Sequence, residues 1–341
     1  MILHFDVTVI GGGPAGIVAA YNIANQGHKV LILEKEPKIG SHINNIENLF
    51  PNFMKAAIVL NELTNKSKHH NIRLITGAFV EKTYKENKLW IVRTSEGKLY
   101  SSDALVLATG FRIFDARYKE ELGYGLYKGV INTVELEAMI KKKEVLSLQG
   151  KLPKKIAFVN CVGSRDEKVG NHYCSRVCCI NAVKQSIEIK ELIPETEIYC
   201  FYMDIRMAGQ FYEELYRKSQ ETYDINYIRG RVSEASETID KRIQIKAEDT
   251  LSQLPLKMTV DILVLMTGIE ASDSTINLCS QLKINGEYGF AKSTNLHLSD
   301  NLTIHRGLFL AGCCKRPLTL PETIADARAA ALNVIDFLNY N

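Results

Sequence analysis

The sequence predicts an α/β protein in which a discontinuous first domain wraps around an inserted second domain. Three observations predict this fold class. A glycine-rich turn joins an apolar strand to a helix (5–36), two apolar strands end in Thr-Gly (103–111 and 261–269), and a strand followed by an Ala-rich helix comes last (307–338). Strands that alternate with helices indicate a parallel sheet. A length of 341 residues is enough for two domains, each with its own core.

The composition excludes several classes of function. Hydrophobic residues make up 46% of the chain, charged residues make up 24%, and the formal net charge is +3. Neither nucleic acid nor an anionic membrane is therefore expected as a partner. The longest apolar runs have strand length and are too short for a membrane span. Because a strand begins almost at the first residue, we expect no signal peptide and predict a cytoplasmic protein. In that compartment clustered cysteines more often mean metal or redox chemistry than disulfides.

The N-terminal turn has the residues that the phosphates of a dinucleotide require. Gly11, Gly13 and Gly16 form a G-x-G-x-x-G pattern between an apolar strand and a helix, and Glu34 ends the next strand 18 residues later. Gly11 permits the tight turn, Gly13 lets the backbone approach a pyrophosphate, and Gly16 packs helix on strand. Glu34 would accept hydrogen bonds from a ribose 2′-OH and disfavours a 2′-phosphate, so NADP is not expected. The alternative interpretation is a glycine turn in an empty βαβ unit.

The rest of the chain favours FAD as that dinucleotide. Both strand-Thr-Gly segments would return the chain to a dinucleotide-binding sheet, and "GLFLAGC" (307–313) is a further buried strand that ends near a glycine. The segment 321–338 predicts a helix that begins around Glu322, because it has a proline at its start and no helix breaker afterwards. A helix N-terminus behind an isoalloxazine ring would stabilise the negative charge of a reduced flavin.

This arrangement resembles the flavoproteins with two dinucleotide-binding domains, the family that includes thioredoxin reductase, over nearly the whole chain. The resemblance implies a Rossmann-like FAD domain formed by 1–112 and 271–341, with a second Rossmann-like domain, 113–270, inserted between them. It implies these FAD-binding residues: Gly11, Gly13, Pro14, Ala15, Gly16, Glu34, Lys35, Val80, Thr109, Gly110, Gly312, Cys313, Glu322 and Thr323.

The predicted insert lacks the second glycine fingerprint that such flavoproteins use for a nicotinamide nucleotide. After the strand 154–160 the chain reads Cys-Val-Gly-Ser-Arg, with Cys161 where the first glycine would be and Gly163 as the single glycine left. A polar stretch, 164–173, precedes the next helix. We therefore expect a dinucleotide-binding shape without a competent NAD site, which argues against a direct NAD(P)H oxidoreductase.

Four cysteines in and after this altered turn have the spacing C-x12-C-x3-C-C: Cys161, Cys174, Cys178 and Cys179. Cys174 and Cys178 share one helix face and Cys179 lies about 100° further round, so convergence requires a loosened helix start. Four converging thiolates fit zinc or an iron–sulfur cluster. Adjacent cysteines fit a cluster with separate irons better than one tetrahedral ion, and a redox dithiol would be expected as C-x-x-C. We predict a [4Fe–4S] cluster, with zinc, a redox disulfide and inert core cysteines as alternatives.

The two halves of this signature, "CVGSRDE" and "YCSRVCC", resemble the A-type flavoprotein of heterodisulfide reductase and its shorter relatives in sulfur-oxidising and quinone-linked complexes. The segments 204–216, 225–232 and 320–331 add to the resemblance, which covers most of the chain. It implies that the four cysteines ligate a cluster, and that FAD and the cluster form an electron path between soluble partners. Full-length members add ferredoxin modules with C-x2-C-x2-C-x3-C-P, which this chain lacks. It also lacks the cysteines that follow a Phe-Pro, here Phe50-Pro51. One cluster is the most that the signatures predict, and the short sulfur-oxidation-type member of the family is the better match in length.

The predicted function is an FAD- and [4Fe–4S]-dependent electron-transfer subunit of a heterodisulfide-reductase-like complex. Its partners would be the other subunits of that complex or a ferredoxin-type electron carrier, and the resemblance is compatible with a homodimer. No residue is predicted as a nucleophile or a general base. The alternatives are a self-contained NAD(P)H-dependent flavoprotein disulfide reductase and a non-catalytic flavoprotein scaffold.

Other reactive residue types receive simpler interpretations. Cys313 is a candidate thiol near the flavin or at a partner surface, with a small residue in a crowded turn as the alternative, whereas Cys314 is interpreted as such a turn residue. Cys200 and Cys279 lie in apolar stretches and are interpreted as core. Arg206 is interpreted as part of an ordinary ion pair, with a partner surface or a hydrogen bond to the cluster as alternatives.

Overall fold

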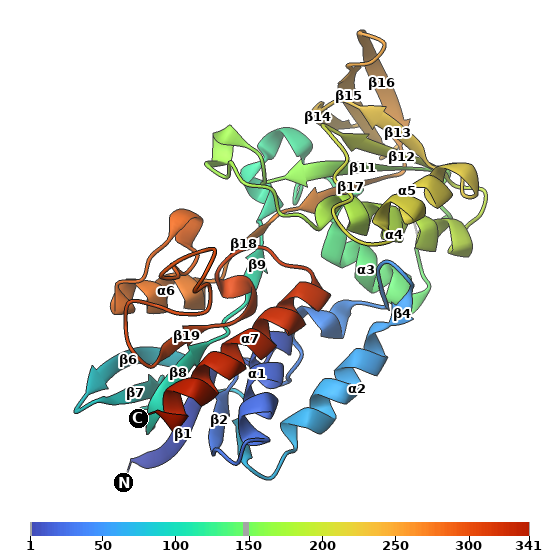
Figure 1. Ribbon diagram of the computed structural model, residues 1–341. Helices are drawn as coiled ribbons and strands as arrows, with labels where there is room; N and C mark the ends of the chain where they lie inside the picture. Colours follow the sequence, from blue (N-terminus) through green and yellow to red (C-terminus); the bar gives the residue numbers. More distant parts are fainter. Residues whose placement is uncertain (1, 146–149, 341) are drawn as a thin grey trace. The chain divides into compact units, whose positions relative to one another are not determined.

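The structure, a computed structural model, describes residues 2–145 and 150–340, and it divides the chain into two compact units (Figure 1). Unit 1 is Met1–Asn44, Ala57–Arg112 and Glu270–Asn341, and unit 2 is Asn45–Ala56 and Ile113–Ile269. Most of unit 2 corresponds to the predicted insert, 113–270. Residues 45–56, which the prediction placed in the segment 1–112, cluster with unit 2 instead.

Unit 1 is built on a sheet with the strand order β5-β2-β1-β8-β7-β6, in which β19 also pairs with β8. The strands are β1 (Leu3–Ile10), β2 (Val30–Leu33), β5 (Ile72–Ile75), β6 (Val80–Glu86), β7 (Leu89–Thr94), β8 (Leu99–Leu107) and β19 (Leu308–Leu310). The strands β5, β2, β1, β8 and β19 are parallel, and β8, β7 and β6 form an antiparallel meander. Every residue of β2 is buried, as expected of a parallel strand covered on both faces.

The helices in the described part of unit 1 are α1 (Pro14–Ala24), α2 (Ala56–Ser67), α6 (Asp273–Leu282) and α7 (Leu320–Asn339). The two helices α1 and α7 pack against each other beside the sheet (Figure 1). The buried residues of both helices include several alanines, and small side chains let helix axes approach closely. A capping box formed by Thr319 and Glu322 starts α7 at Leu320, two residues before the predicted start at Glu322.

Unit 2 has a parallel sheet with the order β10-β17-β11-β12-β13 and an antiparallel sheet β14-β15-β16. The parallel strands are β10 (Val130–Asn132), β11 (Lys155–Val162), β12 (Glu197–Tyr202), β13 (Asn226–Arg229) and β17 (Ile262–Thr267). The antiparallel strands are β14 (Val232–Glu237), β15 (Ile243–Asp249) and β16 (Leu254–Val260). The register between β11 and β17 shifts between Val159 and Val162, so β11 is irregular at its carboxyl end.

The helices in the described part of unit 2 are α3 (Thr133–Lys142), α4 (Cys178–Leu192) and α5 (Tyr212–Glu221). The segment 45–56 adds a small antiparallel pair, β3 (Asn48–Leu49) and β4 (Met54–Lys55). The strands β9 (Phe111–Ile113) and β18 (Ile269–Ala271) pair where the chain passes between the units. Among the described helices, none combines the length and the apolar character that a membrane crossing needs.

Candidate functional site

The glycine turn of unit 1 is fixed by close backbone contacts. Gly11 has φ +115, and a Cβ there would lie 2.2 Å from the carbonyl oxygen of Ala108. A Cβ on Gly16 would lie 1.9 Å from the carbonyl oxygen of Gly11. Neither position therefore admits a side chain, because backbone atoms cannot move aside as a flexible side chain can.

The middle glycine of the turn is open instead of packed. A Cβ on Gly13 would meet only the Cβ of Ser41, at 3.6 Å, which is ordinary van der Waals contact. Gly13 is the N-cap of α1, where no side chain caps the helix and no acid lies in the first turn. No capping side chain therefore uses the backbone N–H donors beside Pro14 and Ala15. These donors and the positive end of the helix dipole are available to an external anion. This open helix start is the feature that a pyrophosphate requires.

Glu34 lies beside the same turn. Its side chain is 6% exposed, and its carboxylate accepts hydrogen bonds from the N–H groups of Gly12 and Glu36, the latter at 2.8 Å. The next residue, Lys35, is half exposed and forms an ion pair with Glu36 at 3.9 Å. The structure thus brings the predicted ribose acceptor to the predicted phosphate turn.

The strand-Thr-Gly turn after β8 anchors α6. The hydroxyls of Thr109 and Thr275 are 2.6 Å apart, and the N-cap residue Ser272 donates to the carbonyl of Thr109 at 3.0 Å. Gly110 has φ +66, and no atom lies within 4 Å of the Cβ that a substitution would add. Val80 is buried at the start of β6. Gly110 is therefore the open member of this group, whereas the Thr109 hydroxyl is occupied within the protein.

Gly312 begins a short 3-10 turn, Gly312–Cys314, that packs against the start of α1. Its φ is +74, and a Cβ there would lie 2.6 Å from the Cβ of Ala15. Its N–H donates to the carboxylate of Asp326 on α7 at 2.6 Å. Asp326 also accepts from Lys315 at 2.6 Å, and this lysine is buried.

Sequence reasoning missed Asp326 and Lys315, together with Asp300, which pairs with Lys315 at 2.8 Å and with Arg316 at 2.7 Å. The one signal in the sequence concerns Asp326, which is an acid inside an Ala-rich helix. The three charged partners hold the Gly312 turn in place beside the predicted cofactor residues.

In the same corner of unit 1, hydrogen bonds within the protein engage the side chains of Cys313, Glu322 and Thr323. The Cys313 thiol lies 3.6 Å from both the Thr323 hydroxyl and the Leu318 carbonyl, and burial raises its pKa. The Glu322 carboxylate accepts from the N–H and the hydroxyl of Thr319, both at 2.8 Å. The Glu322 side chain is therefore engaged in capping α7.

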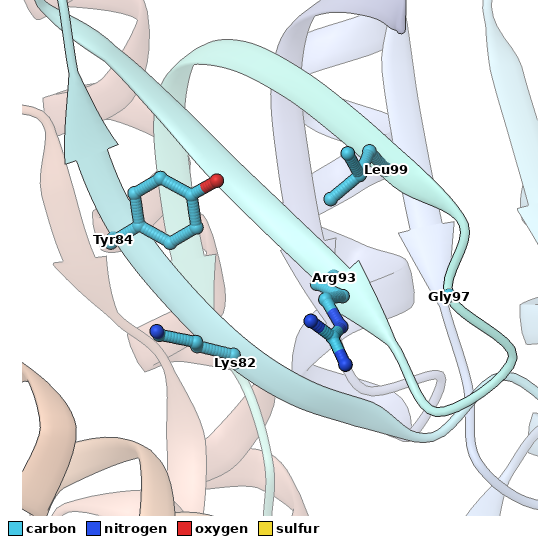
Figure 2. A pocket seen from close by; sticks show the side chains of 5 residues that line it. All are labelled: Lys82, Tyr84, Arg93, Gly97 and Leu99. Carbon is cyan, nitrogen blue, oxygen red and sulfur yellow. The ribbon is translucent and has the colours of Figure 1, made fainter.

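A pocket in unit 1 lies on the meander of β6, β7 and the start of β8. It is lined by Lys82, Tyr84, Arg93, Gly97 and Leu99 (Figure 2). None of the predicted FAD-binding residues lines it, so it is separate from the predicted cofactor site.

In unit 2 the turn after β11 differs from the turn of unit 1 at both decisive positions. Cys161 has φ +62, a left-handed conformation that is uncommon for a residue other than glycine. Gly163 has φ +75, and a Cβ there would lie 2.1 Å from the ring of Phe114. The remaining glycine is thus covered by an aromatic ring instead of being open to a ligand.

A long ordered loop separates this turn from the helix that follows it. The loop, 163–177, is fixed to the first residue of β18: Ser175 accepts from the N–H of Ile269 at 2.8 Å, and the Tyr173 hydroxyl donates to the carbonyl of Ile269 at 2.7 Å. Asn171 donates back to the carbonyl of Gly163 at 3.0 Å. The strand-Thr-Gly turn of unit 2 is therefore bound by protein atoms.

Three of the four predicted ligand cysteines lie together. Cys161, Cys178 and Cys179 are free and buried, and the Cys178 thiol is within hydrogen-bonding reach of both others. These hydrogen bonds raise the pKa of Cys178 and lower that of Cys161. They also lower the pKa of Cys179 to about 7, where the backbone N–H of Arg206 contributes.

Cys174 is partly buried, and arginines hydrogen-bond its sulfur as they do that of Cys161. The N–H of Arg176 donates to its sulfur at 3.3 Å, and the Arg206 guanidinium hydrogen-bonds the same sulfur. Arg165 hydrogen-bonds Cys161. Asp204 pairs with Arg165 and with Arg206, the latter at 3.1 Å. Arg206 therefore forms the ion pair that we predicted and also a hydrogen bond to a predicted ligand.

The structure does not draw the four sulfurs into a compact tetrahedron. In residues 2–145 and 150–340, no three cysteine sulfurs lie within 4.8 Å of one another. The cysteines are neighbours around one corner, and the ligand set stays a prediction.

Buried polar groups without partners lie beside these cysteines. The amide oxygen and nitrogen of Asn160 and the hydroxyls of Ser164 and Thr267 are buried and have no hydrogen-bond partner in the part of the chain that the structure describes. Asn160 directly precedes Cys161, Ser164 follows it three residues later, and Thr267 pairs with Val162 at the end of β17. Buried polar groups are rarely left unpaired, and water or a bound group can supply the missing partner. Four free thiols and these polar atoms fit an iron–sulfur cluster.

The helix that carries Cys178 and Cys179 also carries a buried charged network. Lys184, 1% exposed, donates to both carboxylate oxygens of Glu137 at 2.6 and 2.8 Å and lies 3.1 Å from Glu188. Asn48 donates to Glu188 at 2.7 Å, and the N–H of Glu47 donates to Glu137 at 3.0 Å. This network, which sequence reasoning missed, ties the segment 45–56 to α3 and α4.

The remaining cysteines are buried, in agreement with their interpretation. Cys200 and Cys279 are fully enclosed, and burial raises the pKa of each to about 12. Cys314 is also enclosed, and its thiol donates to the carbonyl of Leu107 at 3.2 Å. These thiols have the character of core residues.

The fold and its glycine turn define a class of protein, and comparison with known families agrees. Residues 5–331 match the family described as "Pyridine nucleotide-disulphide oxidoreductase", and the chain belongs to this family. It is an oxidoreductase of the FAD-binding Rossmann type. Thioredoxin reductase from Lactococcus lactis is similar in structure, with a TM-score of 0.71, 16% identity, and coverage of 99% of this chain and 100% of that one. Thioredoxin reductase from T. acidophilum has a TM-score of 0.69, 17% identity and 98% coverage of both chains. The predicted fold class is confirmed.

Within this class, the chain is similar to the A subunits of heterodisulfide reductases. It is 32% identical to the A-type iron–sulfur component of the CoB–CoM heterodisulfide reductase of Methanocaldococcus jannaschii, over 95% of this chain and 63% of the relative. It is 31% identical to the A-type component of the H(2)/formate:CoB-CoM heterodisulfide,ferredoxin reductase of Methanococcus maripaludis, over 95% of this chain and 62% of the relative. The predicted resemblance is confirmed, and the chain spans less than two thirds of the length of these relatives.

Proposed function

We propose that this chain is the FAD- and [4Fe–4S]-dependent electron-transfer subunit of a heterodisulfide-reductase-like complex in sulfur or disulfide metabolism. The observation that carries the proposal is the replacement of a phosphate-binding turn by thiols. In unit 2 the glycine positions are Cys161 and a glycine covered by Phe114, and free cysteines gather there with unpaired polar groups.

The proposed FAD site is the open turn of unit 1. Gly11, Gly13 and Gly16 with Pro14 and Ala15 would receive the pyrophosphate at the start of α1. Glu34 would accept from the ribose, and Lys35, Val80, Thr109, Gly110 and Gly312 would line the site with Cys313, Glu322 and Thr323. The bound FAD would supply the exchange between electron pairs and single electrons. The residues present fit it, because the open Gly13 and the uncapped helix start are what the phosphates need.

The proposed cluster ligands are Cys161, Cys174, Cys178 and Cys179. Thiolates are the usual ligands of such clusters, and hydrogen bonds to the sulfurs set the potential. Arg165, Arg176 and Arg206 supply donors to these sulfurs, so the protein's own contribution is to hold the thiolates and compensate their charge.

The proposed partners are other subunits of such a complex or a ferredoxin-type carrier. The names of the relatives support this, since one is called an iron–sulfur component of its reductase and the other belongs to a heterodisulfide, ferredoxin reductase. A homodimer stays a prediction.

Anaerobic purification tests the proposal, with iron and acid-labile sulfide analysis and EPR of the reduced protein. We expect about four irons per chain. Cys178→Ser should lose the cluster, whereas the matched control Cys200→Ser, also a buried cysteine of unit 2, should retain it. Zinc in place of iron, or iron that is insensitive to Cys178→Ser, would overturn the cluster.

A self-contained NAD(P)H-dependent flavoprotein disulfide reductase is the competing function. The family name favours it, since the family comprises pyridine nucleotide-disulphide oxidoreductases. NADH alone, mixed anaerobically with the purified flavoprotein, should leave the visible flavin absorption band unchanged. Rapid bleaching would establish the competing function. A flavin that cannot be reduced reversibly in the assembled complex would instead indicate a scaffold.

A further inference from the structure

We infer that the arginines around the cysteine site form a docking surface for an acidic one-electron carrier protein. The surface, called here the arginine rim, consists of Arg165, Arg176, Arg206, Arg229 and Arg231. The inference rests on the proposed function, because a carrier needs a redox centre beneath its docking surface.

The inner part of the rim touches the sulfurs. Arg165 hydrogen-bonds Cys161, and Arg206 hydrogen-bonds Cys174. The backbone of Arg176 donates to Cys174 at 3.3 Å, and its side chain is exposed. Three arginines from two separate segments, 164–177 and 204–206, therefore meet at the cysteines.

The outer part of the rim continues from there to β13 and β14. The Arg231 guanidinium donates to the carbonyl of Arg165 at 2.8 Å and contacts the Met203 sulfur at 2.7 Å. The Arg229 guanidinium donates to the carbonyl of Met203 at 3.3 Å. Both residues are exposed. A chain of contacts therefore leads from the exposed Arg231 through Arg165 to Cys161.

The rim combines five arginines with the carboxylate of Asp204, and the backbone of Glu248 and Asp249 lies beside Gly230, between the two outer arginines. Asp204 pairs with Arg165 and Arg206. In the described residues, no carboxylate forms an ion pair with Arg229 or Arg231. Asp166 interacts electrostatically with Arg231, but its carboxylate forms an ion pair with Lys119 at 2.7 Å.

The net charge of the whole chain is only +3, so an attraction to an acidic partner would come from this surface and not from the chain as a whole. A positive patch attracts a negative partner over about a Debye length and orients it during the encounter. Exposed rim charges act mainly on the association rate and give it a salt dependence. A carrier held on the rim would have its own centre next to the cysteine sulfurs, where a single electron can pass.

A nucleotide fits this surface less well than a protein does. Phosphate sites use open glycine turns and free helix N-termini. Here Gly163 is covered by Phe114, and α4 begins with the buried Cys178. The outer arginines, Arg229 and Arg231, are exposed at the end of β13 and just before β14, whereas the inner arginines come from 164–177 and 204–206, and this spread suits a broad protein surface.

The test measures binding and electron transfer with a dithionite-reduced, acidic two-cluster bacterial ferredoxin as the probe. Biolayer interferometry gives the association rate constant, and stopped-flow absorbance gives the transfer rate, each at several salt concentrations. The charge-reversal double variant Arg229→Glu/Arg231→Glu should lower the association rate constant at low salt at least tenfold and flatten its salt dependence. The neutral double variant Arg229→Gln/Arg231→Gln should lie between it and the wild type.

The matched control is Lys241→Glu/Arg242→Glu, which makes the same change in charge at the turn between β14 and β15. It should bind the ferredoxin as the wild type does. An equal loss in both charge-reversal variants, or no loss in either, would overturn the inference. Micromolar ADP binding that is lost in Arg229→Glu/Arg231→Glu and displaces the ferredoxin would also overturn it, in favour of a nucleotide.

Iron content separates this inference from the proposed function. Salt-dependent ferredoxin binding that disappears in the rim variant supports the rim as a docking surface, even in a preparation without iron, while the missing iron refutes the cluster. The opposite outcome is a full complement of iron together with ferredoxin binding that is the same in the wild type and in Arg229→Glu/Arg231→Glu. It refutes the rim as a docking surface and supports the cluster.

Discussion

The two strand-turn-helix elements of this chain, β1 to α1 and β11 to α4, both begin with a parallel strand but differ in the turn after it. In unit 1 the strand β1 reaches α1 through an open glycine turn, and Gly13 faces no backbone that a side chain would strike. In unit 2 the strand β11 has a left-handed Cys161 one residue before its end, and Phe114 covers Gly163. The first turn leaves backbone N–H groups available, whereas the second fills the same place with thiols and aromatic packing.

The difference shows that two Rossmann-like units of one chain can share a parallel sheet and differ in the turn that follows the strand. The parallel strands and the Thr-Gly ends are present in both units. What differs is the distance along the chain between strand and helix, and the fate of two glycine positions. If the two units bind the proposed groups, the turn sets the ligand chemistry and the sheet supplies the frame.

The largest expected effect tests whether the open turn depends on backbone packing. Gly16→Ala places a Cβ 1.9 Å from the carbonyl oxygen of Gly11, so we expect a loss of about 4 kcal/mol or more of unfolding free energy in urea. The control Gly27→Ala has φ +93 and no atom within 4 Å of the new Cβ, so its cost should be about 1 kcal/mol. Equal stability of the two variants would contradict the packing argument.

A smaller effect tests the charged support behind the open turn. Burial alone would raise the pKa of Asp300, but hydrogen bonds from Arg316 and Lys315 outweigh it and hold the pKa below its usual value. The resulting stability is present above the ordinary carboxyl pKa of about 4 and is lost as the pH falls through the lowered pKa. Asp300→Asn should therefore lose about 2 kcal/mol near pH 7 and less in acid.

Urea unfolding at a series of pH values measures this difference. The control Glu96→Gln removes an exposed carboxylate that pairs with Lys98, and its curve should superimpose on that of the wild type. A deficit in Asp300→Asn that stays constant down to the lowest pH would show that the ion pairs do not carry the stability.

Gly13→Ala separates binding from folding in unit 1. Its Cβ has room and its φ of −78 is allowed for alanine, so the protein should fold. A methyl group at the phosphate turn should weaken FAD binding about tenfold, or about 1.4 kcal/mol. Fluorescence titration of the apoprotein with FAD measures this, and unchanged affinity would place the phosphates elsewhere.

The smallest effect is expected from restoring a glycine in unit 2. Cys161→Gly relieves a left-handed conformation that costs about 1 kcal/mol, but it removes a buried thiol of comparable value, so unfolding free energy should change by less than about 1 kcal/mol. NADH should still not bind, because Phe114 covers Gly163 and the loop 163–177 follows. Saturable NADH binding in calorimetry would show that the cysteine alone had closed the site.

The sequence was most informative where the determinants are local. Gly11, Gly13, Gly16 and Glu34 lie within one βαβ segment, and their spacing predicted the turn that the structure shows. The cysteine spacing likewise predicted that Cys161, Cys178 and Cys179 lie near one another. The apolar pattern also located α7, although its cap at Thr319 moved its start to Leu320.

The residues that the sequence did not reveal are charged groups whose partners are distant in the chain. Lys184 and Glu137 look like surface residues of two helices, and only the packing of α3 on α4 buries them together. Arg165 and Asp204 meet at the cysteines from separate loops. Such pairs leave no periodic signal, because a charge is expected on a helix face or loop whether or not it is later enclosed.

The attachment of residues 45–56 to unit 2 has a consequence for biosynthesis. This segment leaves the ribosome long before Glu137 and Lys184, to which it is bound. Strand β8 of unit 1 must likewise wait for β19. Unit 2 can close once β17 has emerged, whereas unit 1 closes only after the last strand arrives. The unit that contains the first strand is therefore the second to be completed, and a nascent chain must keep its apolar β1 and β2 protected in the interval.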